Sequence, residues 1–70
     1  MKEIFFLIQE VPEGGYTARA IGQSIFTEAE DLQTLKENIK EVLECHFEHK
    51  ADRPSIVNLH FVRDEILTLA

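Results

Sequence analysis

The sequence predicts a two-layer α+β domain with the element order β-β-β-α-β. Three observations support this fold class. Short runs rich in β-branched and aromatic residues occupy most of the first 28 positions. Between residues 30 and 47 the apolar residues change to spacings of three and four, the period of a helix that packs through one face. A last run rich in Ile, Val and Phe follows Pro54.

The first three strands are expected to form an antiparallel meander. The first strand is predicted over residues 3–11, and it is apolar on both faces. A turn over residues 12–15 follows, because proline cannot continue a strand ladder and paired glycines accept the positive φ of tight turns. Strands over 16–21 and 24–28 complete the meander. Along the first strand, one face carries Phe5 and Leu7, and the other carries Ile4, Phe6 and Ile8.

A single helix is predicted to follow the meander. It begins near Glu30 or Asp31, where acidic side chains match the positive end of the helix dipole, and Lys50 lies near its negative end. Its apolar stripe consists of Leu32, Leu35, Ile39, Val42, Leu43, His46 and Phe47. Its outward face consists of Gln33, Lys36, Glu37, Lys40, Glu41, Glu44 and Glu48.

A fourth strand is predicted over residues 55–63, again with apolar side chains on both faces. The apolar segment over 66–70 is expected to dock on a protein surface, which can belong to a neighbouring molecule. One helix covers only one face of a sheet. Burial of the other face in a homodimer or higher assembly is therefore expected. The residues assigned to that interface are Ile4, Phe6, Ile8, Phe61, Ile66 and Leu67.

Composition limits the function classes. The chain has 70 residues and a mass of 8.1 kDa, which predicts one domain over residues 1–70 with roughly 4,500 Å² of accessible surface. With 13 acidic and 7 basic residues, its net charge of −6 disfavours direct binding to nucleic acid or to an anionic membrane. One cysteine forms no internal disulfide, which suits the cytoplasm. The apolar run 4–8 is too short for a signal peptide or a membrane span.

A metal site is one candidate for chemistry. Cys45 and His49 are four residues apart on the predicted helix, a spacing that can share a zinc ion, and His46 and His60 are further candidate ligands. Two separated ligand pairs, which are typical of zinc sites, are missing. The default interpretation is a helix-end histidine that complements the dipole. Cys45 and His46 do not form a nucleophile pair, because adjacent helical residues do not face each other.

The carboxylates give two further hypotheses. A two-carboxylate hydrolase or a metal-dependent nuclease can be imagined, but the acids are interpreted as solvated surface, and no catalytic residue is assigned. The candidates are Glu10, Glu28, Asp52 and Asp64. A second group of acids follows helical spacing and would attract a basic protein surface by electrostatic steering. This candidate partner-binding face consists of Glu37, Glu41, Glu44 and Glu48.

The chain carries four motifs in order, which are Glu13-Gly14-Gly15-Tyr16-Thr17-Ala18, Thr27-Glu28-Ala29, the helical run 32–41 and Leu59-His60-Phe61-Val62-Arg63-Asp64-Glu65. With these motifs and its element order, the chain resembles the HicB-like antitoxin family over nearly its whole length. The resemblance implies a truncated RNase H-like domain that binds and covers a small basic toxin that cleaves mRNA. Many family members also carry a C-terminal DNA-binding segment. None is expected here, because the sequence ends just past the last strand.

The resemblance does not imply catalysis. Ribonuclease H chemistry needs a metal-binding acidic cluster anchored in the middle of the first strand, and residues 4–8 contain no carboxylate. The chain also resembles short stand-alone proteins of this superfamily, some of which carry the name of a 2-oxoisovalerate dehydrogenase subunit. A chain of 70 residues without a diphosphate-binding motif cannot enclose a thiamine cofactor. The expected function is therefore a cofactor-free protein-interaction module. The alternative is a small-ligand or metal-binding accessory protein.

Overall fold

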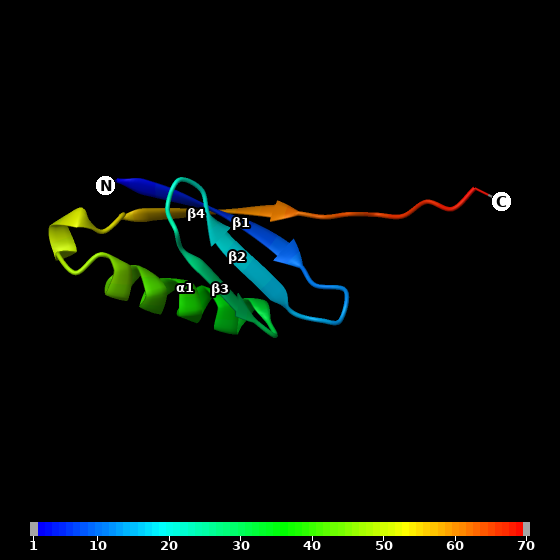
Figure 1. Cartoon of the computed structure of the whole chain (residues 1–70), viewed down its shortest axis with the longest axis horizontal. Helices are drawn as coiled ribbons and strands as arrows, with labels where there is room; N and C mark the ends of the chain where they lie inside the picture. The colour runs from blue at the N-terminus through cyan, green and yellow to red at the C-terminus, as the bar shows by residue number, and fades with distance from the viewer. Residues whose placement is uncertain (1, 70) are drawn as a thin grey trace.

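The computed structural model describes residues 2–69 as one four-stranded mixed sheet with a helix on one face (Figure 1). The sheet order is β3-β2-β1-β4. The α+β class and the order β-β-β-α-β are confirmed. The elements are β1 (Glu3–Glu10), β2 (Tyr16–Ala20), β3 (Phe26–Ala29), α1 (Leu32–His46), the short 3-10 helix η1 (Lys50–Asp52) and β4 (Ile56–Val62).

The turn between β1 and β2 depends on paired glycines. The Val11 N–H donates to the Gly15 carbonyl at 2.9 Å, and the Gly14 N–H donates to the Val11 carbonyl at the same distance. Gly14 and Gly15 have φ angles of +105° and +102°, a region that residues with a Cβ rarely adopt. The predicted turn chemistry of residues 12–15 is therefore confirmed.

The third strand begins two residues later than predicted. The Ala20 N–H donates to the Ile25 carbonyl at 3.0 Å, so the hairpin turn extends through Ile25 and β3 starts at Phe26. Ile25 is buried and Phe26 is exposed, so the two side chains point to opposite faces of the sheet. Ile25 therefore belongs to the core although it lies outside the strand.

At both ends of α1, side chains form hydrogen bonds with backbone groups that have no partner within the helix. The Thr34 N–H donates to the Asp31 carboxylate at 2.7 Å, so Asp31 is the N-cap of the helix. These hydrogen bonds from Thr34 hold the pKa of Asp31 below its ordinary value. At the other end, the Arg53 guanidinium donates to the Phe47 carbonyl at 2.8 Å and to the Glu44 carbonyl at 3.3 Å. Arg53 therefore caps the last turn, and Lys50 begins η1 beyond the end of the helix.

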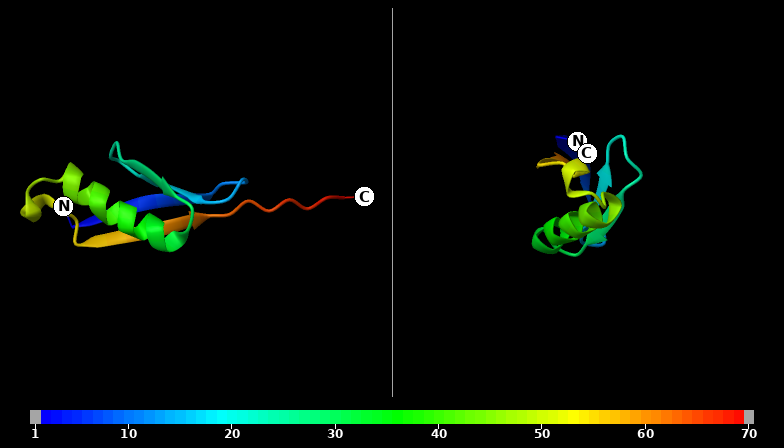
Figure 2. Two further views of the ribbon diagram at one scale, coloured as in Figure 1. Left: turned by 90° about the horizontal axis from the view of Figure 1, so that it is seen from below. Right: turned by 90° about the vertical axis from the view of Figure 1, so that its left-hand side faces the viewer.

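β4 lies beside β1 and runs parallel to it, with Phe6 opposite Leu59 and Ile8 opposite Phe61. A parallel neighbour requires a crossover connection, and α1 supplies it between β3 at one edge and β4 at the other. Figure 2 shows the helix lying along one face of the sheet. The crossover therefore decides which face of every strand is covered.

The core lies between α1 and the covered face of the sheet. Phe6, Ile8 and Leu35 are its most completely buried large side chains, and each such burial contributes about 1.5–3 kcal/mol. Ile4 is only 3% exposed beside them. The assignment of Ile4, Phe6 and Ile8 to a dimer interface is therefore wrong, because the helix of the same chain already covers these three side chains.

One member of the predicted apolar stripe also differs. His46 is exposed, and its ring lies edge-on to Phe47 with 4.8 Å between ring centroids. The helix ends at His46, and Phe47 continues the core from an extended backbone conformation. The other stripe positions are buried or partly buried, as predicted.

The molecule is more extended than its size requires. Its accessible surface is 5626 Å², against roughly 4,500 Å² expected for a compact chain of 8.1 kDa. The radius of gyration is 14.1 Å, against about 11 Å expected for 70 residues. Residues 63–69, which we call the tail segment, project beyond β4 in an extended conformation (Figure 1). Ala70, the last position of the predicted docking segment, lies outside the described residues.

The two glycines of the first turn differ in the space around them. A Cβ on Gly15 would lie 2.9 Å from the Ala29 carbonyl oxygen, whereas a Cβ on Gly14 would meet nothing within 4 Å. We expect Gly14→Ala to lower the free energy of unfolding by about 1–3 kcal/mol through its positive φ alone. Gly15→Ala should lower the free energy of unfolding further, because β3 must also shift to make room for the new Cβ atom. Urea denaturation of both variants measures the difference, and equal losses would contradict the close approach of Gly15 to Ala29.

The Asp31 cap predicts a specific pH dependence. The folded-state pKa of Asp31 is lowered. Its contribution to the free energy of unfolding is therefore fully present above the ordinary pKa of 3.8 and is lost as the pH falls through the folded-state pKa. Asp31→Ala should therefore lower the Tm near neutral pH, and the gap to the unmodified chain should close well below pH 3.8. Asp31→Asn, which retains a capping oxygen, is the matched control. A gap that is constant across this pH range would refute the ionised cap.

Candidate interaction surfaces

The candidate metal ligands are not brought together. Cys45 and His46 are exposed on the last turn of α1, and His49 is exposed beyond it. His60 lies opposite Leu7 in the β1–β4 register, on the sheet face away from the helix. Within residues 2–69, no group of three or more His, Cys, Asp or Glu side chains could hold a metal ion. The four residues therefore do not form one coordination site.

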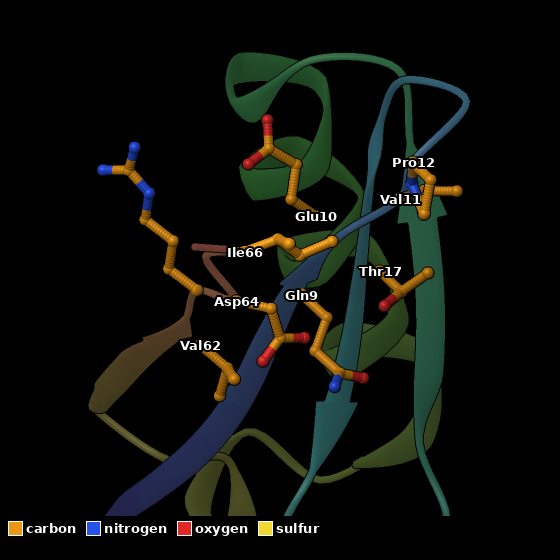
Figure 3. Close-up of a pocket in the computed structure, with 9 residues that line it drawn as sticks. Gln9, Glu10, Val11, Pro12, Thr17, Val62, Asp64 and Ile66 are labelled. Atoms are coloured by element: carbon orange, nitrogen blue, oxygen red, sulfur yellow. The ribbon is translucent and has the colours of Figure 1, made fainter. Parts of the chain in front are cut away.

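The four carboxylates of the hydrolase hypothesis are also dispersed. Glu10 and Asp64 both line a hollow of about 550 Å³ where β1 and β4 end. Figure 3 shows their carboxylates pointing in opposite directions from this hollow. Glu28 lies on β3 and Asp52 on η1. The two carboxylates that do share the hollow are therefore not oriented toward a common reacting atom, which a carboxylate pair requires.

The acidic residues of the helix do share one face. Glu37, Glu41 and Glu44 are exposed, and they lie on α1 opposite the side that buries Leu35 and Ile39. We call these three residues the acidic stripe. Glu48 is exposed as well, but α1 ends at His46, so the assignment of Glu48 to the helix is wrong. Arg53 explains the earlier end, because it closes the last turn from outside the helix.

The sheet face away from α1 is not covered by any part of residues 2–69. Phe5, Phe26 and Ile56 lie on this face with exposed fractions of 46%, 56% and 48%. The prediction that the first strand is apolar on both faces is confirmed, with Phe5 and Leu7 on the uncovered side. Burial of this face by a second copy stays a prediction.

The helix leaves β4 partly uncovered on its own side of the sheet too. The Asn38 amide donates to the Glu28 carbonyl of β3 at 3.1 Å, which holds α1 toward the β3 edge. A groove of about 240 Å³ remains between α1 and β4. We call it the edge groove. Its lining residues are Gln33, Lys36, Glu37, Ile39, Lys40, Val57 and Leu59.

The edge groove was not predicted from the sequence. The sequence pattern assigns Lys36 and Lys40 to the outward face of the helix, whereas the structure places both beside the apolar side chains of Val57 and Leu59. The available signal is helical geometry, because Lys36 and Lys40 are one turn apart and lie roughly 60–100° from the centre of the buried stripe. That signal indicates the flank of the helix, but it does not say which strand the flank adjoins.

No helix within residues 2–69 has the length and apolar character needed to cross a membrane.

Comparison with known proteins identifies the family. No protein-family profile and no solved structure match the sequence significantly. A protein of Archaeoglobus fulgidus named "UPF0150 protein" is 51% identical over 53 residues, which are 76% of this chain and 77% of that protein. A protein of Thermotoga maritima with the same name is 40% identical over 63 residues, which are 90% of this chain and 87% of that protein. Neither carries the name of an enzyme. At these identities and coverages, the chain belongs to the UPF0150 family.

Proposed function

We propose that this chain is a non-catalytic protein-interaction module that masks a basic surface of a partner protein, as the resemblance to HicB-like antitoxins implies. The observation that carries the proposal is the acidic stripe. Glu37, Glu41 and Glu44 are exposed on a helix whose other side is fixed in the core by Leu35 and Ile39. A rigid helix presents these carboxylates without the ordering cost that a flexible segment would pay on binding.

The charges of the stripe are available to a partner. Among residues 2–69, no cationic side chain forms an ion pair with Glu41 or Glu44, and Glu37 accepts only a long 3.4 Å hydrogen bond from Gln33. The net charge of −6 adds a long-range field that attracts a basic protein and speeds encounter. Masking needs no catalytic group, because covering the basic surface of an RNA-cleaving partner blocks its access to RNA.

The cellular setting follows from the same chemistry. The single cysteine, Cys45, is a free exposed thiol, which suits the reducing cytoplasm. A small basic toxin that cleaves mRNA would act in that compartment.

Charge reversal tests the acidic stripe. We expect Glu37→Lys/Glu41→Lys/Glu44→Lys to weaken binding of a basic partner by about tenfold or more, because each reversal removes an attraction of about 0.2–1 kcal/mol and adds a comparable repulsion. The matched control is Glu3→Lys/Glu13→Lys/Glu28→Lys, which changes the net charge equally at exposed positions off the helix. The measurement is capture of partners by each tagged protein from extracts of its own cells, with mass spectrometry and titration of the recovered protein.

The outcomes of this capture experiment distinguish a wrong binding surface from a wrong function. The proposal predicts a small basic protein in stoichiometric amount with the unmodified chain and the control, and its loss with the stripe variant. Equal recovery by all three chains would show that the stripe is not the binding surface. Recovery of no basic protein by the unmodified chain would overturn the proposed function itself.

A further inference from the structure

Two parts of the chain lack partners along the same edge of the sheet. β4 is an edge strand, so the side of its backbone away from β1 is unpaired. The tail segment continues β4, but its neighbour does not continue with it. The β1–β4 register ends at Gln9 opposite Val62, and β1 then turns away through Pro12. Within residues 2–69, no strand lies beside the tail segment.

The tail segment is apolar as well as unpaired. Ile66, Leu67 and Leu69 are 90%, 85% and 88% exposed, and Figure 1 shows the segment pointing away from the body of the molecule. Isolated apolar residues on a surface need no explanation, but three within four positions of an extended segment are a strong candidate for strand addition.

We propose that a second copy of this chain covers this edge. In the proposed dimer, β4 and the tail segment of one copy pair antiparallel with the tail segment and β4 of the other copy. The tail segment of each copy thereby lies beside the edge groove of its partner. This inference goes beyond the proposed function and does not depend on it, because the acidic stripe lies outside the edge groove apart from Glu37 at its rim.

Strand geometry selects the register. In a two-fold antiparallel pair, directly opposite residues point to the same face, and residues two apart on a strand share a face. Val57 and Leu59 point to the helix side, since they lie opposite the buried Ile4 and Phe6. The odd-numbered residues of an extended tail segment then also point to that side. A two-fold axis at Arg63 places Leu67 opposite Leu59 and Leu69 opposite Val57.

The side chains of the edge groove support the same occupant. In the proposed register, Leu67 and Leu69 lie beside the two apolar β4 residues that line the edge groove, Leu59 and Val57. An extended segment whose apolar side chains meet the apolar side chains of a groove beside an unpaired strand edge is the arrangement of strand addition.

The extra surface that the chain exposes is large enough to form one dimer interface. The chain exposes about 1,100 Å² more than a compact chain of its mass, the difference between 5626 Å² and roughly 4,500 Å². A standard protein interface buries about 800 Å² on each partner. The excess surface therefore matches what one symmetric interface removes from each copy.

The tail segment of the same chain is a poorer occupant of its own groove. It would have to reverse direction directly after Val62, and residues 63–69 contain no glycine, proline, asparagine or serine, with Asp64 as the one residue of a type that favours tight turns. Exchange between two copies requires no reversal, because the segment simply continues β4.

The first test is the oligomeric state of the full chain and three variants by light scattering after size exclusion, from low-micromolar to submillimolar concentration. We expect the unmodified chain to have twice its 8.1 kDa mass. Leu67→Asp in the tail segment and Val57→Asp in the edge groove should each raise the dimer dissociation constant by at least tenfold. The matched control, Ile21→Asp, changes an apolar residue that is 61% exposed directly after β2, and this variant should remain dimeric.

Leu67 is 85% exposed, so Leu67→Asp leaves the fold of one copy intact, and circular dichroism checks this. A monomeric unmodified chain at all concentrations would overturn the proposal. So would a dimer that Leu67→Asp leaves unchanged.

A disulfide test fixes the register. In a Cys45→Ser background, chains with Leu59→Cys and chains with Leu67→Cys are mixed, refolded and oxidised, so that each chain carries one thiol. Directly opposite Cβ atoms lie close enough for a disulfide. We expect mixed dimers between positions 59 and 67. Replacing the second chain by one with Ile66→Cys, which points to the other face, should abolish them, and equal crosslinking from position 66 would contradict the register.

Discussion

One helix has to cover a four-stranded sheet that carries apolar side chains on both faces, and it lies toward one edge of the face that it covers. The hydrogen bond from Asn38 to the Glu28 carbonyl holds α1 beside β3, while Leu35 and Ile39 bury Phe6 and its neighbours. Because the crossover leads to β4 at the far edge, that strand receives the least cover. The core, the uncovered face and the edge groove all follow from the position of this helix.

The two proposals use different consequences of this arrangement. The outward side of α1 is free to carry carboxylates because the other side is fixed in the core, which gives a rigid acidic stripe. The flank toward β4 borders apolar side chains on an unpaired edge, which favours a second copy of the chain. Association through the edge groove leaves Glu41 and Glu44 exposed, so a dimer can present two acidic stripes and gain avidity for a partner with two basic surfaces.

Residue type and periodicity together predicted the fold, because runs of β-branched and aromatic residues indicated the strands and apolar spacings of three and four indicated the helix. These signals predicted the element order and the helix stripe to within a few residues. They could not say which face of β1 the helix would cover, since both faces are apolar, and so Ile4, Phe6 and Ile8 were placed on the wrong side. The end of α1 was missed because Arg53 caps it from six and nine residues away. Contacts of that kind leave no local pattern.

A second copy of the chain that covers the β4 edge and the tail segment would hold backbone amides of both in hydrogen bonds. Amide hydrogen exchange of residues 63–69, measured at several protein concentrations, detects this protection. Every second amide of residues 63–69, those that point toward β4 of the other copy, should be protected at high concentration and lose protection on dilution, while the amides of β1 stay protected throughout. Fast exchange of all amides in residues 63–69 at every concentration would show that no second copy pairs with the tail segment, because unpaired backbone amides exchange freely with solvent.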